Sequence, residues 1–570
     1  MEIRNYSTDV AIIGGGGAAL RAAIEASEKG QKVILVDKGR PGRSGATPCA
    51  LWSVQAPFGP RGQDERDSPE QFFEDMVTAG RFIGDQNLVE IVAFTACDRM
   101  LDLERYGVHF KKHDDGRFVQ TPMPGQTYPR SCFMIENGQH MSTVLAKEVS
   151  KHDNIQVFKD FFVFNLLKNA DSVVGLIGID MLTGDTVVIN AKVTVVAAGG
   201  YASLWGFSDN PPTLIGDGAA MAYRVGAELV DLEFNQYYGT DVIWPPSVKG
   251  TIFLYELMIS DFVDGEITDK DGNPIIDKPL PIRDDAIKTI FNVIKEGRGT
   301  EHGGVYYDTT VSPKTEAEIS QLFKDMTPKH YRFLKDAAGI DAANQRLEVA
   351  PASHYQCGGI YINERGESSI NRLYACGEVA GNFQGANRLA GSALCDTQTM
   401  GAQVGGCAAD DAAKADLIPV EKSAIDQQID YLQSFISDKQ AETRPVFIKE
   451  KILETMDAHV APFRDEKGLQ QGLEAIKSLK AEVSKISVAD IKRYNFELKE
   501  ALETSFALDA AEITIGSCLF RTESRGHHNR TDFPEMDDKD WRCHTIVKQE
   551  GDKPMYAKRD VIYTRLKPED

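Results

Sequence analysis

Residues 8–39, TDVAIIGGGGAALRAAIEASEKGQKVILVDKG, constrain the fold more than any other part of the chain. Two β-rich apolar runs enclose an alanine-rich stretch with helical spacing, which predicts strand, turn, helix and strand in that order. Gly14, Gly16 and Ala19 fill the positions that allow a tight turn, access of backbone N–H groups to a pyrophosphate, and close helix packing. Asp37 ends the second strand, where an acid can bind a ribose hydroxyl. We expect a Rossmann-like nucleotide site; a glycine-rich loop without a ligand is the alternative.

Two later segments also contain a strand that breaks into small residues. In residues 191–206, AKVTVVAAGGYASLWG, the strand ends at Ala198 and Gly199, where the backbone can lie close to a flat ligand. In residues 372–381, RLYACGEVAG, Glu378 follows a short strand and could bind a ribityl or ribose hydroxyl. Nucleotide-binding elements on both sides of a long insert predict a discontinuous cofactor domain.

The rest of the chain divides by composition. A length of 570 residues predicts about three or four domains, or one elaborate domain with insertions. Proline and charged residues increase between about residues 235 and 350, which predicts an inserted cap. From about residue 416, apolar residues recur at helical spacing. Residues 521–541 follow as a polar loop, and we expect Glu523–Arg530 within it to pack on the cofactor domain or on a partner rather than to act in catalysis.

Charge and cysteine content exclude several classes of function. The net charge of −22 argues against nucleic acid and anionic membrane surfaces as partners. The nine cysteines are scattered without a C-x-x-C pair, so we predict no disulfide framework, no iron–sulfur cluster and no metal site. No apolar run approaches the length of a membrane span. We expect a cytoplasmic protein that reaches a membrane only through partner subunits.

The ordered motifs resemble the flavoprotein subunits of the fumarate reductase and succinate dehydrogenase family, whose relatives include L-aspartate oxidase and adenylylsulfate reductase flavoproteins. The motifs are GxGxxA, AAGG, GDGAAMAYRVGAEL, PASHYQCGGI, ACGEVAG, GANRLAGSAL and RTESRGHHNRTDFPEMDD. The resemblance implies an α/β fold with a Rossmann-like FAD-binding domain, an inserted α+β cap and a C-terminal helical domain. We expect an FAD domain of residues 1–234 and 351–415, a cap of residues 235–350, and a helical domain with a terminal extension of residues 416–570.

The resemblance also implies roles for single residues. His354 matches the histidine that holds a substrate carboxylate, Arg388 the arginine that clamps it, and Arg283 the cap arginine that moves the substrate proton. The alternatives are a structural His354, an Arg388 that neutralises reduced flavin, and an Arg283 that forms surface ion pairs. The expected FAD contacts are Gly14, Gly16, Ala19, Asp37, Lys38, Ser44, Gly45, Ala198, Gly199, Asp217, Glu378, Arg388 and Ser392.

These side chains suit the reduction of an activated C=C bond, in which flavin gives hydride to one carbon and a proton reaches the other. Arg388 can bind a carboxylate through two N–H groups while His354 donates another hydrogen bond. Both would stabilise the charge that develops as hydride arrives. Arginine is a poor acid because its pKa exceeds about 12. We therefore expect Arg283 to be desolvated and connected to a carboxylate relay, with Glu256 or Asp284 as candidates.

The sequence departs from the family where a second carboxylate would bind. Asn235 or Gln236 stands near the place of the family's substrate histidine, and only Glu256 remains of a Thr-Glu pair. Met123 and Pro124 stand where an aromatic residue is expected. Neutral groups in a desolvated site disfavour a second carboxylate by several kcal/mol. We expect an unsaturated monocarboxylate or a bulkier α,β-unsaturated acid in place of fumarate.

Residues 43–52, RSGATPCALW, bear on how the cofactor is held. In the fumarate and succinate branch, a histidine in this segment bonds covalently to FAD. Here the segment has no histidine, and the first one in the chain is His109. We predict non-covalent FAD, with Cys49 as a buried thiol; a Cys49 tether is the alternative. Trp52 either packs in the core or faces the substrate.

The sequence thus predicts an FAD-dependent oxidoreductase that transfers hydride between flavin N5 and the C=C or CH–CH bond of a carboxylic acid. We expect it to be the flavoprotein subunit of an electron-transfer complex with an iron–sulfur partner; a soluble carrier or oxygen are the alternatives. Two other functions remain open: an adenylylsulfate-reductase-like or aspartate-oxidase-like flavoenzyme, and an FAD relay between proteins without a small-molecule substrate.

Overall fold

The computed structural model describes residues 3–258, 262–437 and 441–568. Its N-terminal segment forms β1 (Ile3–Ile13), α1 (Gly17–Glu28) and β2 (Val33–Val36), and the two strands pair in parallel. Every residue of β2 is buried, as expected for a strand that is covered on both faces. The prediction of a Rossmann-like unit at this place is confirmed.

A seven-stranded sheet forms the base of this domain, in the order β6–β2–β1–β9–β8–β7 with β16 also beside β9. The strand β9 (Asp185–Val196) has two kinds of neighbour: residues 185–190 pair antiparallel with β8, and residues 194–196 pair in parallel with β16. The carboxyl ends of β1, β2, β9 and β16 therefore meet at one edge, where open α/β sheets bind ligands. The other strands are β6 (Ile155–Phe158), β7 (Phe161–Asn169), β8 (Ser172–Asp180) and β16 (Leu373–Ala375).

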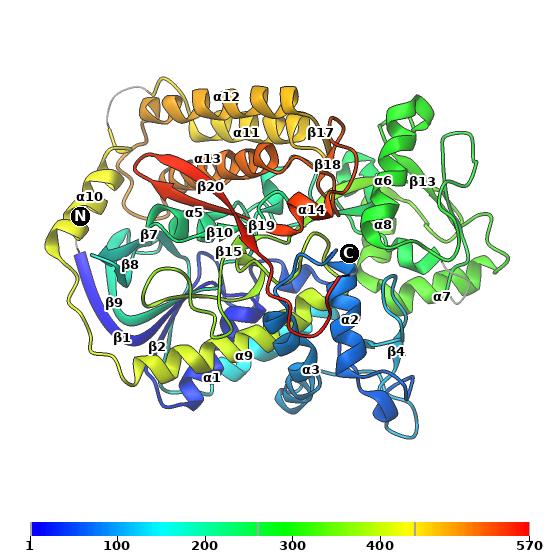
Figure 1. Ribbon diagram of the computed structural model, residues 1–570, viewed down its shortest axis with the longest axis horizontal. Coiled ribbons are helices and arrows are strands. Elements are labelled where there is room, and N and C mark those ends of the chain that lie inside the picture. The colour runs from blue at the N-terminus through cyan, green and yellow to red at the C-terminus, as the bar shows by residue number, and fades with distance from the viewer. Residues whose placement is uncertain (1–2, 259–261, 438–440, 569–570) are drawn as a thin grey trace.

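Small residues let two helices pack closely beside this sheet. The helices α1 and α9 (Ser392–Ala412) lie side by side (Figure 1). A Cβ atom added at Gly405 would lie 2.5 Å from the carbonyl oxygen of Ala22, so only glycine fits at this crossing. Further helices of this part are α2 (Pro69–Ala79), α3 (Gln86–Tyr106), α4 (Asn137–Val149) and α5 (Asp217–Arg224). A small sheet contains β3 (Ser53–Gln55), β4 (Gln120–Thr121) and β5 (Ser131–Phe133).

The cap is built on a four-stranded antiparallel sheet in the order β11–β14–β13–β12. The expected boundary between residues 350 and 351 falls inside β14 (Leu347–Gln356), because this strand runs on from the cap into the cofactor domain. The other elements are β11 (Asn235–Trp244), β12 (Glu266–Thr268), β13 (Val305–Asp308), α6 (Arg283–Val293), α7 (Glu316–Met326) and α8 (Pro328–Ala338). Figure 1 shows the three helices on the right of the molecule.

The C-terminal part combines packed helices with a hairpin. The helices α11, α12 and α13 contact one another and lie along the top of Figure 1. The hairpin β19–β20 pairs with β10 (Leu229–Val230), which also pairs with β15 (Gly359–Ile360), so the terminal extension joins the cofactor domain. The remaining elements are α10 (Lys422–Gln433), α11 (Pro445–His459), β17 (Phe463–Arg464), α12 (Glu466–Glu482), α13 (Phe496–Phe520), β18 (Asn529–Arg530), α14 (Asp538–Trp541), β19 (Cys543–Glu550) and β20 (Lys553–Asp560).

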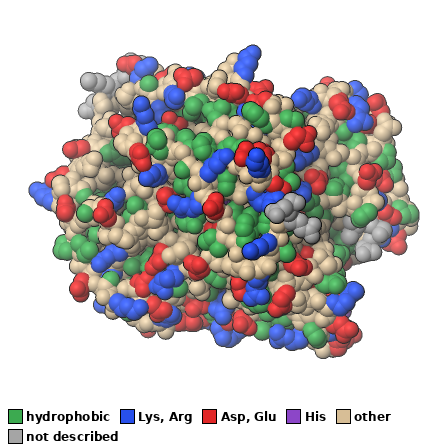
Figure 2. Space-filling view, in the orientation of Figure 1, with side chains coloured by type: hydrophobic (Ala, Val, Ile, Leu, Met, Phe, Trp, Pro, Cys, Tyr) green, Lys and Arg blue, Asp and Glu red, His purple; other side chains and the backbone are tan. Residues whose placement is uncertain are grey.

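Two further features concern the composition of the helices and the charges on one face of the surface. Within the described residues, every helix is too short or too polar to cross a membrane. On the face that Figure 2 shows, lysines and arginines are scattered among acidic side chains and are not gathered into a basic patch.

Candidate active site

A cleft opens at the carboxyl edge of the large sheet and extends to side chains of the cap. The glycine turn forms one wall. Gly14 has a φ of +126°, and a Cβ atom there would lie 2.2 Å from the carbonyl oxygen of Ala197 at the end of β9. A Cβ atom at Gly15 would lie 2.6 Å from Cγ of Asp37. The N-cap of α1 is Gly16, so backbone rather than a capping side chain faces the position where pyrophosphates bind.

Most of the expected FAD contacts line this cleft. They are Gly14, Gly16, Asp37, Lys38, Ser44, Gly45, Ala198, Gly199, Asp217, Glu378 and Arg388. Two expected contacts do not. Ala19 is buried inside α1, in keeping with a packing role. The hydroxyl of Ser392 lies 2.8 Å from the carbonyl oxygen of Leu389 and 3.2 Å from Oε1 of Gln384, away from the cleft wall.

Charged groups along the cleft hold one another in place. Lys38 Nζ lies 2.8 Å from Asp217 Oδ2 and 3.2 Å from Glu503 Oε1, and these carboxylates raise its pKa although burial opposes the charge. Burial raises the pKa of Asp37, whose carboxylate accepts a hydrogen bond from the Ser44 hydroxyl. Burial also raises the pKa of Glu378 to about 7. Glycines at close contacts, an acid at the end of a strand, and a helix N-terminus whose backbone N–H groups face the cleft are together the features of a dinucleotide-binding site.

At the cap side of the cleft, His354 and Arg388 form a hydrogen-bonded pair. Arg388 NH2 donates to His354 Nε2 over 2.9 Å, and His354 Nδ1 donates to Asp209 Oδ2 over 2.6 Å. Because Nε2 accepts, the imidazole is neutral in this arrangement. Burial and the Arg388 guanidinium lower the pKa of His354, although Asp209 opposes them. The expected donation from His354 to a carboxylate therefore requires that the ring first gain a proton.

Arg283, at the first residue of α6, is buried and paired with one of the two expected relay acids. Its NH2 group lies 3.2 Å from Glu256 Oε1, and the Tyr238 hydroxyl donates to the other oxygen of Glu256. Glu256 and Tyr238 raise the pKa of Arg283, although burial opposes the charge. Asp284 instead accepts from Arg81 over 2.8 Å. The alternative in which Arg283 pairs with Asp284 therefore does not hold, because Arg81 forms that ion pair.

Gln236 joins the two arginines through one atom. Its Oε1 accepts from Arg283 NH1 and from Arg388 Nε, each over 3.0 Å. Its Nε2 donates to the carbonyl oxygen of Arg388 and to Asn387 Oδ1, each over 2.9 Å. Burial and the nearby Arg283 lower the pKa of Arg388 to about 10. Asn235, the other residue expected here, points its amide to Ser353 Oγ over 3.1 Å.

Apolar side chains form another wall of the same cleft. Trp52 packs in the core, because it is 1% exposed and stacks on Phe133 at 5.2 Å, and it also lines the cleft. Met123 also lines the cleft. The prediction of a buried thiol at Cys49 is wrong, because this side chain is exposed at the cleft. It lies in the short turn Thr47–Cys49, which leaves it facing the cleft.

Sequence reasoning missed Asp209, Tyr238 and Tyr355. The ring of Tyr355 lies 4.6 Å from the guanidinium carbon of Arg388. Strand periodicity could have found Tyr238, since it lies two residues after Gln236 on β11 and so shares its face of the strand. Asp209 lies in an irregular loop, where neither periodicity nor a motif marks it.

Comparisons with known proteins agree with this geometry. The model of an FAD binding domain matches residues 9–394, and the model of the fumarate reductase flavoprotein C-terminus matches residues 449–570. The chain is 35% identical over 544 residues to a subunit of the CoM/CoB fumarate reductase of Methanothermobacter marburgensis. The matched stretch covers 94% of this chain and 96% of that protein.

The chain belongs to the fumarate reductase and succinate dehydrogenase flavoprotein family. It is an FAD-dependent oxidoreductase, and the predicted fold class of FAD domain, cap and helical domain is confirmed. A variant of E. coli quinol fumarate reductase has 26% identity and a TM-score of 0.90, over 100% of this chain and 99% of that one. Adenylylsulfate reductase of Archaeoglobus fulgidus is more distant, at 20% identity with a TM-score of 0.82 over 99% of this chain and 97% of that one, and shares the fold.

Proposed function

We propose that this flavoprotein transfers hydride to or from the CH–CH group of a carboxylic acid that carries one carboxylate near the reacting bond. The observation that carries the proposal is the cluster of Arg283, His354 and Arg388 at the end of a cleft whose other end has the FAD fingerprint. The bound FAD would accept or supply the hydride. The side chains of the cap and of β14 bind the acid and handle the proton.

Arg388 and His354 bind the substrate carboxylate. Arg388 offers N–H groups in a fixed plane, and a protonated His354 adds a hydrogen bond from Nε2. Asp209 holds the imidazole by Nδ1 and stabilises its charged form when the carboxylate arrives. These donors also stabilise negative charge that develops on the carboxylate during hydride transfer.

Arg283 moves the proton at the neighbouring carbon. The guanidinium is buried, so water does not compete for its N–H groups, and it contacts the carboxylate of Glu256. Glu256 and Tyr238 continue the hydrogen-bonded chain away from Arg283. We infer that this chain replaces the proton that Arg283 gives up, so that the guanidinium, a very weak acid, is not left neutral in the buried site.

The substrate is a monocarboxylate or a bulkier unsaturated acid rather than fumarate. Gln236 is neutral, is 0% exposed and uses its amide on Arg283, Arg388 and Asn387, so it does not bind a second carboxylate. Trp52 and Met123 give an apolar wall on the same cleft. A second charge in this surrounding would lose its hydration without compensation.

FAD is held without a covalent bond. The segment that lines the cleft from Ser44 to Ser53 offers one thiol, Cys49, as a nucleophile. The surrounding protein and the Asp209 carboxylate raise the pKa of that thiol, which reduces its reactivity. Denaturation with acid should release all the flavin into the supernatant.

Electrons reach or leave the flavin through an iron–sulfur partner, and this partner provides any attachment to a membrane. The relative from Methanothermobacter is named as one subunit of its enzyme, and the family resemblance covers nearly the whole chain. The chain's nine cysteines have no cluster spacing. Co-purification of a second polypeptide that carries iron and acid-labile sulfur would support this assembly.

The decisive experiment is anaerobic. The holoprotein is photoreduced, mixed with crotonate-type monocarboxylates, bulkier unsaturated acids and fumarate, and the return of oxidised flavin absorbance is followed. We expect reoxidation by at least one acid of the first two classes at a rate well above that with fumarate. Fumarate as the best acceptor would refute the substrate assignment. Failure with every acid would support the relay function, and formation of a flavin adduct with sulfite would support the adenylylsulfate-reductase-like one.

A further inference from the structure

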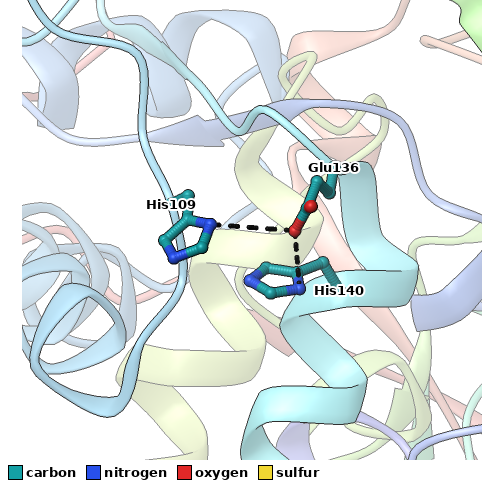
Figure 3. A group of neighbouring side chains, drawn as sticks. All are labelled: His109, Glu136 and His140. Carbon is teal, nitrogen blue, oxygen red and sulfur yellow. Dashed lines mark ion pairs between the residues drawn. The ribbon is translucent and has the colours of Figure 1, made fainter.

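Three side chains outside the cleft turn their ligand atoms toward one point. Glu136 immediately precedes α4, His140 lies one helical turn later, and His109 follows the end of α3. Figure 3 shows both imidazole rings beside the carboxylate of Glu136. The Glu136 Oε2 atom lies 2.8 Å from His140 Nδ1 and 3.8 Å from His109 Nδ1, and all three ligand atoms lie within 4.8 Å of one another. None of the three residues lines the cofactor cleft.

The backbone holds this arrangement in place. The segments that carry His109 and Glu136 run antiparallel, with a bridge between Phe110 and Met134. The N–H of Ile135 donates to the carbonyl oxygen of His109 over 3.0 Å. Because Glu136 and His140 are four residues apart at the start of a helix, their side chains lie on one face. These backbone contacts hold the segments so that the three ligand side chains lie together.

The contacts of His140 turn its Nδ1 atom toward Glu136. His140 Nε2 lies 3.2 Å from the carbonyl oxygen of Gly107, which can only accept, so Nε2 carries the hydrogen. Nδ1 then faces the carboxylate oxygen of Glu136 at 2.8 Å. A positive charge is favourable between these two atoms, and either a proton on Nδ1 or a metal ion supplies it; zinc titration distinguishes the two. A carbonyl that fixes the far nitrogen of a ligand histidine is a common feature of metal sites.

We propose that His109, Glu136 and His140 form a binding site for a divalent transition-metal ion, with zinc as the expected ion. Two imidazole nitrogens and one carboxylate oxygen with an open position to water are a ligand set that zinc accepts. In tetrahedral zinc sites neighbouring ligand atoms lie about 3.3 Å apart for bonds of about 2.05 Å, and the two distances to Glu136 bracket this value. Imidazole ligands disfavour magnesium and calcium, which prefer oxygen.

The ion has a route to the site and a structural consequence. The side chains of His109 and Glu136 are 64% and 52% exposed, so solvent reaches the open face. The N-terminus of a helix carries a partial positive charge, which disfavours a cation. The carboxylate of Glu136 and the protein's net charge of −22 offset this effect. The ion would tie α4 to the segment after α3. Since the N–H of Gly138 donates to the carbonyl oxygen of Ala50 over 3.0 Å, this clamp also supports the turn beside the cleft.

The test uses the FAD-loaded full chain with Cys49→Ser, which removes the exposed thiol, after treatment with EDTA. Zinc chloride is titrated by calorimetry in the presence of millimolar magnesium. We expect one equivalent to bind, with at least tenfold weaker binding in His109→Ala, His140→Ala and Glu136→Gln. His113→Ala is the matched control, because His113 lies in the same segment and pairs with Gln63 instead; its affinity should be unchanged.

Thermal unfolding gives a second readout on the same proteins. Zinc should raise the Tm of the parent and of His113→Ala, and should leave that of the His109→Ala/His140→Ala double variant unchanged. Absence of saturable binding in the parent, displacement of zinc by magnesium, or equal affinity in the double variant and the parent would each overturn the proposal. Should the double variant lose its fold, His109→Ala alone decides, since this side chain is largely exposed.

Discussion

Arg283 and Arg388 reach the same atom, Oε1 of Gln236, each over 3.0 Å. Two buried guanidinium groups thus share one neutral acceptor, and their mutual repulsion with burial lowers the pKa of Arg388 to about 10. A substrate carboxylate would relieve this repulsion, so the site gains affinity for one anion from the charge that it holds in the free protein.

Replacing the shared acceptor by an acid should block the site. In Gln236→Glu, the new carboxylate would satisfy both guanidinium groups without substrate. We expect KM for the carboxylate substrate to rise at least about tenfold, the effect of about 1.4 kcal/mol, with FAD content unchanged. Steady-state kinetics and flavin absorbance measure both. Gln236→Met, of similar size but without an acceptor, is the matched variant and should lower the free energy of unfolding by about 1–3 kcal/mol. An unchanged KM in Gln236→Glu would contradict the shared-acceptor argument.

Binding of the substrate carboxylate should take up a proton. The pKa of His354 is lowered by burial and by Arg388, so the ring is neutral at pH 7 before binding. Donation from Nε2 to the carboxylate requires the charged ring, whose pKa therefore rises in the complex. Calorimetry in buffers of different ionisation enthalpy should show uptake of close to one proton at pH 7–8, and affinity should weaken as pH rises. Zero uptake at pH 7 would mean that His354 does not donate.

Replacement of Arg283 should slow proton transfer and leave flavin binding unchanged. In Arg283→Ala, kcat should fall by roughly 100- to 10,000-fold, the range for a lost acid–base group. The absorbance of bound flavin and its photoreduction should stay as in the parent. Asp285→Asn is the control, because Asp285 is half exposed and lies 3.2 Å from Arg81 rather than from Arg283. A kcat within threefold of the parent in Arg283→Ala would remove this arginine from the proposed mechanism.

The buried Asp241 carboxylate should lower the free energy of unfolding at neutral pH. Its side chain is fully buried, and neither carboxylate oxygen has a hydrogen-bond partner among the described residues. Burial and Asp209 raise its pKa well above the ordinary value. A raised folded-state pKa means that stability is greatest below the unfolded pKa of about 3.9 and is lost as pH rises toward the folded value.

The variant Asp241→Asn removes this titration. We expect it to unfold at about the same denaturant concentration as the parent near pH 4. At pH 7–8 its free energy of unfolding should exceed that of the parent by more than about 1 kcal/mol, the value of one pKa unit. Urea titrations at the two pH values measure the difference. A variant that is less stable than the parent at pH 8 would show that the Asp241 carboxylate has a favourable partner.

The sequence predicted those parts of the site that short motifs encode. The glycine turn, Ala198 and Gly199 could be placed because the backbone conformation they require restricts the residue type. The hydrogen bond from His354 Nδ1 to Asp209 could not be predicted, since a loop of no regular pattern supplies Asp209. The exposure of Cys49 also depends on tertiary packing, because a small thiol fits the core and the surface equally well by composition.

The division of β9 between an antiparallel and a parallel neighbour has a consequence for synthesis of the chain. The cleft edge needs β1, β9 and β16, which are far apart in sequence, and β16 begins only at Leu373. A ribosome must therefore release about two thirds of the polypeptide before the cofactor edge can close. The strand order therefore predicts that the complete flavin-binding edge forms late in synthesis.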